Sequence, residues 1–579
     1  MAALPALSTP GFYDPAKIRE LICKMIIVHE LPFSIVEYTW FNVLLKALNS
    51  AYKKVSRTTI RNECMRLYES EKDALKKSLK NVTKISLTCD LWTSNQTICY
   101  MSLVAHYIDA NWTMRSRIIN FIELDPPHTG VVISNAISDC LAAWKIEDKI
   151  ASITFDNASN NDTAVKLLFA KFKSRGTLWF NGKFLHNRCC AHILNLVVQD
   201  GLEVIDELIE KVRATIKYIK KSNSRSYKFN ADIDSLNLDR RKKLVLDVST
   251  RWGSTFKMLE SAFHYREAID VYAAGDANYK WQPTEDDWKL YEKISKVLGV
   301  LNAATEEFSG SKYPTANLFY PHIVDVRKAL RELKMSKEIL LQKMADAMID
   351  KFDKYWGPEV NILFAIGTIL DPRFKMGMIK FTFPSLYSEI ELPGKLKDVE
   401  STLDELYAVY EAEHNNNKER LKNNESTSQC ASASISSGGA FSSASDYQEY
   451  VKAQTGVQPS KPDLKKYLDD PVEDLANNFD ILQWWRMSEM KYPVVAKMAK
   501  DVLTIPITTV SSESSFSAGG RIVDDYRSSL LPSTVQALVC ASSWIRGGSH
   551  KLPDLEDDAN SIPLSSSEHP SAVSIVGSN

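Results

Sequence analysis

The fold is decided by residues 85–124, which read ISLTCDLWTSNQTICYMSLVAHYIDANWTMRSRIINFIEL. This stretch holds three runs rich in β-branched and aromatic residues, at 85–92, 98–108 and 114–124. Short polar breaks at 95–96 and 109–111 separate the runs. Runs of this composition, joined by short polar connections, predict three consecutive antiparallel strands.

The next segments alternate between helical and strand character. Residues 131–144, 158–172 and 191–202 have the spacing of helices, whereas 150–155 is an apolar strand and 184–186 a short one. Three strands followed by helix and strand in alternation predict a mixed sheet with helices on its faces. The predicted class is therefore α/β (α+β), and the order of elements is that of an RNase H-like fold.

The remainder of the chain is mainly helical. We predict a helical N-terminal region at 1–80, in which Asp14 caps a helix that starts at Pro15, followed by the first part of the core at 81–202. Residues 203–412 have helical period throughout and predict a large all-α insertion. The Ser/Ala/Gly-rich segment 413–460 predicts a flexible linker, 461–546 is helical again, and the Ser/Pro-rich tail 547–579 is predicted to be disordered.

Composition excludes several classes of protein. No apolar run approaches the roughly 20 residues that cross a bilayer, and the first 17 residues lack the pattern of a secretory signal. The nine scattered cysteines do not suggest disulfides and fit a cytosolic or nuclear setting. We find no Gly-rich phosphate loop and no supported Ser-His-Asp arrangement, so no small-molecule substrate is predicted. The net charge of -1 means that nucleic acid could be bound only through local basic patches.

Two aspartates follow predicted core strands. Asp90 lies between apolar neighbours at the end of the first strand, where its charge is costly to desolvate unless a cation offsets it. Asp156 follows the strand at 150–155, and if that strand lies beside the first, the two carboxylates meet and favour a shared metal. Taken alone, Asp90 more often indicates a turn cap, and Asp156 is equally compatible with the N-cap of the next helix.

Glu513 lies in a predicted helix near the other end of the chain, within the sequence TTVSSESSFS at 508–517. By itself it would be assigned to a helix surface or a first turn. The segment before it contains apolar residues in greater number than a short surface segment needs. They either complete a core or form a subunit interface.

Taken together, these motifs resemble the hAT superfamily of DNA transposases, of the plant RICESLEEPER and DAYSLEEPER kind. The resemblance covers roughly residues 11–546. It rests on segments in one order, at 87–94, 155–161, 189–192, 249–252, 308–315, 370–374, 467–468, 480–485, 491–493, 505–506 and 512–517.

The resemblance implies a nuclear DDE-type transposase, a polynucleotidyl transferase, with Asp90, Asp156 and Glu513 as catalytic acids. Such acids would hold Mg²⁺ or Mn²⁺ for in-line displacement at phosphorus. The implied reaction is cut-and-paste DNA excision with hairpinned flanking ends. The alternatives are a domesticated transcriptional regulator that has lost this activity and a dimerising scaffold without phosphoryl transfer.

The resemblance also implies DNA contacts and self-association. His192 would contact a DNA phosphate, and the ring of Trp252, after Arg251, would stack on a flipped base. Without the resemblance, a buried hydrogen-bonded histidine and a core tryptophan explain these residues as well. Homodimerisation, or a higher homo-oligomer, would involve Trp484, Trp485, Tyr492 and Pro493.

Two further features bear on DNA recognition. Cys189 and His192 look like half a zinc site, but no second ligand pair has suitable spacing, so we predict no zinc. Relatives begin with a BED zinc finger, which we do not find here. We therefore expect either that the sequence is truncated or that specific DNA reading is lost or supplied otherwise. Basic clusters could neutralise phosphates, although a basic helix face is more often only solvated; they lie at 53–61, 211–228 and 240–243.

Overall fold

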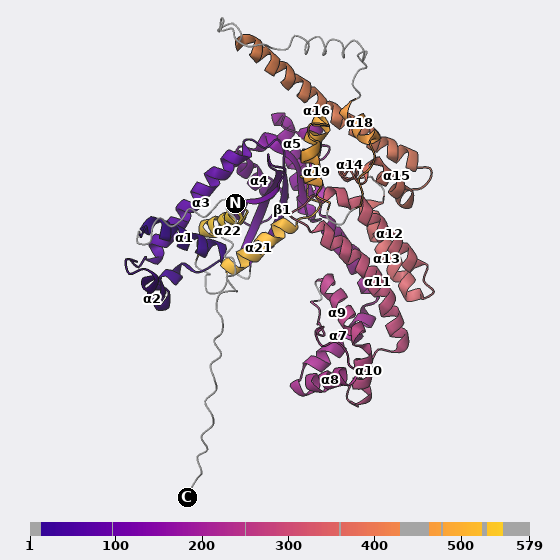
Figure 1. The fold of residues 1–579 in the computed structure, drawn as a ribbon. Helices are drawn as coiled ribbons and strands as arrows, with labels where there is room; N and C mark the ends of the chain where they lie inside the picture. The colour runs from indigo at the N-terminus through magenta and orange to yellow at the C-terminus, as the bar shows by residue number, and fades with distance from the viewer. Residues whose placement is uncertain are drawn as a thin grey trace, which may run out of the picture.

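The computed structural model describes residues 13–94, 97–248, 251–357, 361–428, 462–475, 479–523 and 530–547. Over these residues the chain forms one five-stranded mixed sheet with helices around it, and a long helical arm beside the sheet (Figure 1). The predicted RNase H-like sheet with an all-α insertion is confirmed. Within the described ranges, no helix combines the length and apolar character that crossing a membrane requires.

The N-terminal region is helical, as predicted. Its elements are α1 (Pro15–Val28), η1 (Phe33–Glu37), α2 (Thr39–Leu48) and α3 (Arg57–Leu79). Helix α1 starts where Asp14 accepts hydrogen bonds from the backbone N–H groups of Ala16 and Lys17, with Pro15 at the first helical position. The 3₁₀ turn η1 leads directly into α2, since Tyr38 ends the turn and precedes the first residue of the helix.

The sheet has the strand order β3-β2-β1-β4-β5. Its strands are β1 (Ile85–Thr93), β2 (Cys99–Ile108), β3 (Met114–Glu123), β4 (Ile150–Phe155) and β5 (His186–Arg188). The first three are antiparallel, whereas β4 and β5 run parallel to β1. Parallel pairing needs a helical crossover, and α4 (Gly130–Trp144) supplies it between β3 and β4. Strand β5 starts two residues later than expected.

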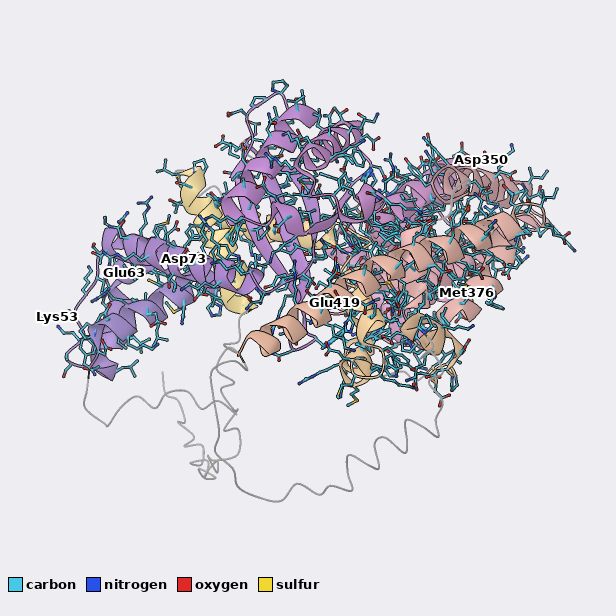
Figure 2. All side chains as sticks on the ribbon, turned by 90° about the horizontal axis from the view of Figure 1, so that it is seen from above. Lys53, Glu63, Asp73, Asp350, Met376 and Glu419 are labelled. Atoms are coloured by element: carbon cyan, nitrogen blue, oxygen red, sulfur yellow. The ribbon has the colours of Figure 1, made fainter. Side chains whose placement is uncertain are left out.

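Helices cover the sheet on both sides. Helices α4 and α5 (Ser159–Arg175) pack so closely that a Cβ atom at Gly130 would lie 2.6 Å from the carbonyl oxygen of Asn160. Figure 2 shows α3, with Glu63 and Asp73, on one side of the sheet and the insertion, with Asp350 and Met376, on the other. The short elements η2 (Glu147–Lys149) and η3 (Trp179–Gly182) precede β4 and β5, and the helix α6 (Cys190–Val204) connects the sheet to the insertion.

The insertion is all helical and has its own hydrophobic core. Its elements are α7 (Asp206–Lys220), α8 (Asn223–Ser235), α9 (Trp252–His264), α10 (Arg266–Ala274), α11 (Glu285–Phe308), η4 (Ala316–Leu318), α12 (Phe319–Lys334), α13 (Ile339–Trp356), α14 (Ile362–Ile369), α15 (Lys375–Leu386) and α16 (Leu392–Ser428). Helix α16 differs from the expectation, since it continues to Ser428 where a linker was predicted from 413. Glutamate, lysine and arginine are frequent over 411–420, and these residues favour helix. Residues 429–461 of the predicted linker and 548–579 of the predicted tail lie outside the described residues.

The C-terminal helices divide between two cores. They are α18 (Asp463–Asp469), α19 (Ile481–Ser488), α20 (Pro493–Val502), α21 (Val510–Ile522) and α22 (Pro532–Arg546). Buried side chains of α18, α19 and α20 join the core of the insertion, whereas those of α21 and α22 join the core of the sheet. Helix α22 covers β3, where Trp544 donates to the carbonyl oxygen of Ile118 at 2.8 Å. This segment therefore connects the insertion to the sheet.

Candidate active site

The register of two parallel strands brings Asp90 and Asp156 together. In the pairing of β1 with β4, Thr88 lies opposite Thr154. Each aspartate follows its threonine by two residues, and side chains two residues apart in a strand point to the same face. The two carboxyl groups therefore occupy neighbouring positions on one face, at the carboxyl ends of the two strands.

Helix α21 lies across this face and carries Glu513 to it. The hydroxyl of Ser512 donates to Thr88 Oγ1 at 2.6 Å, and the hydroxyl of Ser515 donates to Ser102 Oγ at 2.6 Å. Ser102 is the β2 partner of Asp90 in the sheet. Since Glu513 follows Ser512, these two contacts place it beside the aspartates.

The electrostatics of Asp90 shows how near the other acids are. Burial of Asp90, together with the charges of Glu513 and Asp156, raises its pKa to about 7, against a hydrogen bond from the Leu91 N–H that lowers the pKa. Carboxylates repel in this way only when they share a small region of low polarity. The structure therefore brings Asp90 within electrostatic reach of the other two predicted acids.

The other two acids are partly held by their surroundings. Asp156 Oδ1 accepts from the backbone N–H of Ala158 at 3.1 Å and from the side chain of Asn161, so it also orders the turn into α5. Glu513 Oε1 accepts from the Thr509 hydroxyl at 2.9 Å. The second oxygen of each carboxylate receives no hydrogen bond from the described residues. These oxygens suit a cation or a donor from substrate.

The described side chains of the site are of the type that binds a divalent cation, but they do not form a complete ligand set. Carboxylate oxygens are the ligands that Mg²⁺ and Mn²⁺ prefer. Among the residues that the structure describes, however, no three His, Cys, Asp or Glu side chains are placed closely enough to hold one ion together. This is compatible with Mg²⁺, which commonly takes only one or two protein carboxylates and completes its shell with water and substrate phosphates.

A buried chain of hydrogen bonds within the sheet supports α21, and it could not be predicted from the sequence. Thr88 Oγ1 lies 3.1 Å from His106 Nε2, and His106 Nδ1 lies 2.8 Å from Ser116 Oγ. Because Thr88 accepts from Ser512, its own proton can go to Nε2, which leaves Nδ1–H to donate to Ser116. Burial lowers the pKa of His106 to about 3, so the ring is neutral. The only signal in the sequence is the polar residues on the inward face of apolar strands.

Cys189 positions the loop that leads into α21. Its sulfur accepts from the backbone N–H of Thr509 at 3.3 Å and lies 3.2 Å from Thr509 Oγ1, whose proton is donated to Glu513. Burial raises the pKa of Cys189 to about 11, so the thiol keeps its proton at neutral pH. His192 lies three residues on, half-buried in the first turn of α6. A contact of His192 with a DNA phosphate stays a prediction.

Arg251 and Trp252 begin α9. The Trp252 ring is only 6% exposed and belongs to the hydrophobic core of the insertion, whereas Arg251 is exposed. In this structure Trp252 is therefore a core tryptophan, the alternative given above. Stacking on a base would require the ring to leave the hydrophobic core. Ser249 and Thr250 of the same motif lie outside the described residues.

The aromatic residues predicted to dimerise are packed within one chain. The Trp485 indole donates to the carbonyl oxygen of Leu370 at 2.9 Å, and both Trp485 and Tyr492 are buried. Trp484 is half-buried, and Pro493 is exposed at the first position of α20. The alternative that this segment completes a core thus holds for Trp485 and Tyr492. A subunit contact in this region would have to use its exposed side chains.

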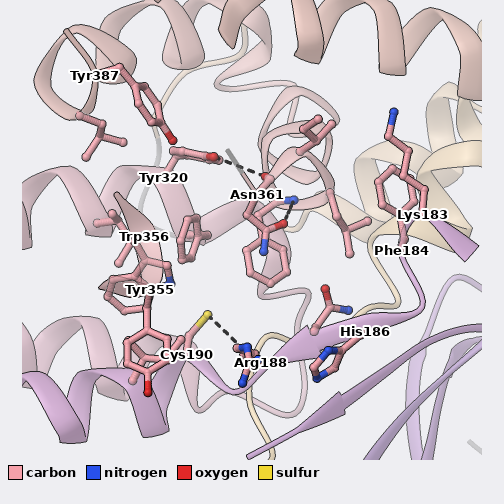
Figure 3. Close-up of a pocket in the computed structure, with 18 residues that line it drawn as sticks. Lys183, Phe184, His186, Arg188, Cys190, Tyr320, Tyr355, Trp356, Asn361 and Tyr387 are labelled. Atoms are coloured by element: carbon pink, nitrogen blue, oxygen red, sulfur yellow. Dashed lines mark hydrogen bonds between the residues drawn. The ribbon is translucent and has the colours of Figure 1, made fainter. Parts of the chain in front are cut away.

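A cavity of about 350 Å³ lies beside the edge strand β5 (Figure 3). His186 and Arg188 line it from the strand, and the aromatic rings of Tyr320, Tyr355 and Trp356 line it from the insertion. Arg188 is already paired with Asp162 of α5 at 2.8 Å, so its charge is neutralised.

Comparisons with known proteins match most of the chain. Residues 317–410 match the family description "hAT-like transposase, RNase-H fold", and 463–545 match the "hAT family C-terminal dimerisation region". Residues 88–184 match the ZBED1 RNase-like domain and 187–297 the ZBED1 RNase-like helical domain. The matched stretch 317–410 is helical here and belongs to the insertion.

Individual relatives match more than nine-tenths of the chain. Zinc finger BED domain-containing protein RICESLEEPER 2 of Oryza sativa subsp. japonica is 34% identical over 548 residues, 92% of this chain and 75% of its own length. The putative AC transposase of Zea mays is 34% identical, over 95% of this chain and 68% of its own length. DAYSLEEPER of Arabidopsis thaliana is 29% identical, over 92% and 74%.

Proposed function

The chain belongs to the hAT transposase family, and on this premise we propose that it is a nuclear DNA-binding protein whose three acids support metal-dependent DNA strand transfer. Asp90, Asp156 and Glu513 would hold Mg²⁺ or Mn²⁺, which supplies charge stabilisation at the attacking and leaving oxygens of a phosphodiester. The protein's own part is to fix the acids on two strands and one helix and to keep Asp90 away from water.

One observation supports this proposal above the others. Asp90 lies within electrostatic reach of two acids from distant parts of the sequence, Asp156 and Glu513, and the charges of both raise its pKa. Such mutual repulsion destabilises the fold unless a cation offsets it, so a purely structural role does not explain why all three are present. The hydroxyl contacts of Ser512 and Ser515 fix α21 in the position that creates the repulsion.

The experiment is DNA cleavage and joining by the purified full-length chain in Mg²⁺ or Mn²⁺. We expect Asp156→Asn to abolish the products, since a neutral amide no longer contributes charge to the site. The control is Asp139→Asn, which removes a carboxylate from an exposed position of α4 and should leave activity unchanged. Equal activity in the two variants would contradict the catalytic role of Asp156.

We also propose that the C-terminal region forms a homodimer through its exposed apolar side chains. Leu475, Met487 and Met490 are 71%, 75% and 97% exposed, which is unusual for large apolar side chains. All three lie in the region that matches the hAT C-terminal dimerisation region. Met487→Ser with Met490→Ser should shift the mass measured by light scattering towards the monomer. Met335→Ser, at an 82% exposed methionine of the insertion, should not.

The alternative is a DNA-binding regulator or dimerising scaffold without catalysis. One relative, 25% identical over 91% of this chain, is called "Putative transcriptional regulator tpeD". DNA binding and dimerisation without any cleavage in either metal ion would favour this alternative. Absence of salt-sensitive binding to random duplexes would exclude strand transfer and the DNA-binding regulator, and would favour the dimerising scaffold.

A further inference from the structure

Some basic residues between 211 and 243 have an acidic or aromatic partner within the chain, and others have none among the described residues. Arg213 donates to both oxygens of Asp247 at 2.9 and 2.8 Å, and Lys211 pairs with Asp287 at 2.9 Å. The other occupied cations and their partners are Lys217 with Glu210, Arg225 over the ring of Tyr218, Lys228 over the ring of Tyr272, Arg240 with Asp234 and Arg241 with Asp239. Most of this basic run is therefore structural.

Four lysines of the run have no acidic or aromatic partner within the described chain: Lys220, Lys221, Lys242 and Lys243. Three of the four line a single hollow of about 370 Å³, which we call the lysine hollow: Lys220 at the end of α7, and Lys242 and Lys243 in the connection between α8 and α9. Arg240 also lines it, and no acidic side chain does.

The lysine hollow has the chemistry of a phosphate site. Three lysines around one concave surface, with no acid among the lining residues, give it a positive potential, and an anion bound there reduces the repulsion between them. The deeper lining is apolar and cannot neutralise the lysines; it consists of Ile219, Phe229, Ile233, Leu244 and part of Tyr265. Asn230 and Ser226 add polar side chains to the lining. An anion with several oxygens can contact more than one lysine at once.

We propose that the lysine hollow binds phosphate groups, and that the backbone of DNA supplies them. This proposal rests on the proposed DNA-binding function and adds to it a contact surface in the insertion. Figure 1 shows α8 and α10 at the end of the insertion farthest from β1, so the contact lies away from the three acids. Phosphate contacts position DNA without reading its sequence, and their strength falls as salt rises.

The test compares two triple variants of the full-length chain, by fluorescence anisotropy with duplex DNA at several salt concentrations. The first is Lys220→Gln, Lys242→Gln and Lys243→Gln. The second, a control, is Lys289→Gln, Lys296→Gln and Lys334→Gln, which removes the same charge from exposed lysines of the insertion that are paired with acids. Exposed substitutions of this kind leave the fold intact.

We expect the first variant to bind duplexes of any sequence about tenfold more weakly, with the slope of log affinity against log salt reduced by roughly 2 to 3. The control should resemble the unchanged chain. Normal DNA binding by the first variant overturns the proposal while leaving the proposed function in place. Absence of DNA binding by the unchanged chain overturns both.

Calorimetry with inorganic tripolyphosphate separates the two sources of phosphate. In one outcome, the unchanged chain binds tripolyphosphate but not DNA, and that binding is lost in the first variant. This result would identify a site for small phosphates and overturn the assignment to DNA. Failure to bind either ligand would overturn the phosphate site itself.

Discussion

At the scale of single residues, Asp90 shows how position controls protonation. Its pKa is raised to about 7 because the carboxyl is buried and two other carboxylates lie near it. A folded-state pKa above the unfolded value means that the folded chain holds this proton more tightly. The resulting stabilisation is fully present below the ordinary pKa of 3.8 and is lost as the pH rises to about 7, so the metal-free protein should become less stable between about pH 4 and pH 7.

The same pKa predicts a pH-dependent affinity for metal. A protonated carboxyl is a poor ligand, so binding of Mn²⁺ must release the proton. We expect calorimetry to show affinity that rises with pH, by up to about tenfold per unit below pH 7, and then levels. Asp90→Asn should weaken binding and flatten the profile. Affinity in the unchanged chain that is equal at pH 5.5 and pH 7.5 would contradict this role of Asp90.

The sequence made some of these residues predictable and not others. Asp90 and Asp156 could be paired because each ends an apolar strand, and adjacent parallel strands end at one edge. Glu513 has no local signal, since its contacts are made by a helix far along the chain, and only the family resemblance singled it out. Trp252 shows the converse: the motif suggested an exposed ring, but packing against the insertion buries it.

At the scale of elements, α21 depends on close contact with the sheet. A Cβ atom at Gly519 would lie 2.6 Å from the Phe121 ring, which is buried and stacked on Tyr100 with centroids 5.2 Å apart. The ring has little room to move, so Gly519→Ala should destabilise the protein by about 1–3 kcal/mol in denaturant unfolding. The substitution should also reduce DNA cleavage, because a shift of α21 would move Glu513 away from the aspartates.

The next residue of α21 provides the control. At Gly520 the nearest atom to a new Cβ, in the Trp92 ring, is 3.8 Å away, an ordinary contact. Gly520→Ala should therefore be neutral or stabilise the helix by up to about 1 kcal/mol. Equal destabilisation by the two alanines would show that the approach of α21 to the sheet is not limiting.

The bounds of the helices and strands could be predicted from the sequence pattern more closely than the packing of these elements against one another. The three antiparallel strands and the crossover helix α4 fall within two residues of their expected bounds, because alternation and helical period are local properties. Helix α16 continues past 413, the predicted start of the linker, because glutamate, lysine and arginine are interspersed among the asparagines there. Nothing local could show that α18–α20 and α21–α22 enter different cores.

At the scale of the whole molecule, the link between the sheet and the insertion depends on how the returning C-terminal segment is held. Lys375 is buried, and its Nζ donates to the carbonyl oxygens of Tyr467 and Asp470 at 2.6 Å and of Pro471 at 3.1 Å. Burial lowers the pKa of Lys375, and the negative charge of Asp470 opposes that effect. One ammonium group thus satisfies three carbonyls at the end of α18.

We therefore expect Lys375→Met to detach this segment in part. The substitution keeps the length of the side chain but leaves buried carbonyls without a donor, at a cost of about 1–3 kcal/mol for each one that stays dry. Hydrogen exchange should speed up in 463–475 more than in β1, and cleavage of DNA should fall because α21 follows the same segment. Lys380→Met, at an exposed lysine of the same helix whose carboxylate partner is 3.9 Å away, should change neither quantity. Unchanged exchange in 463–475 would mean that Trp485 and Tyr467, which also bond to the end of α14, hold the segment without the lysine.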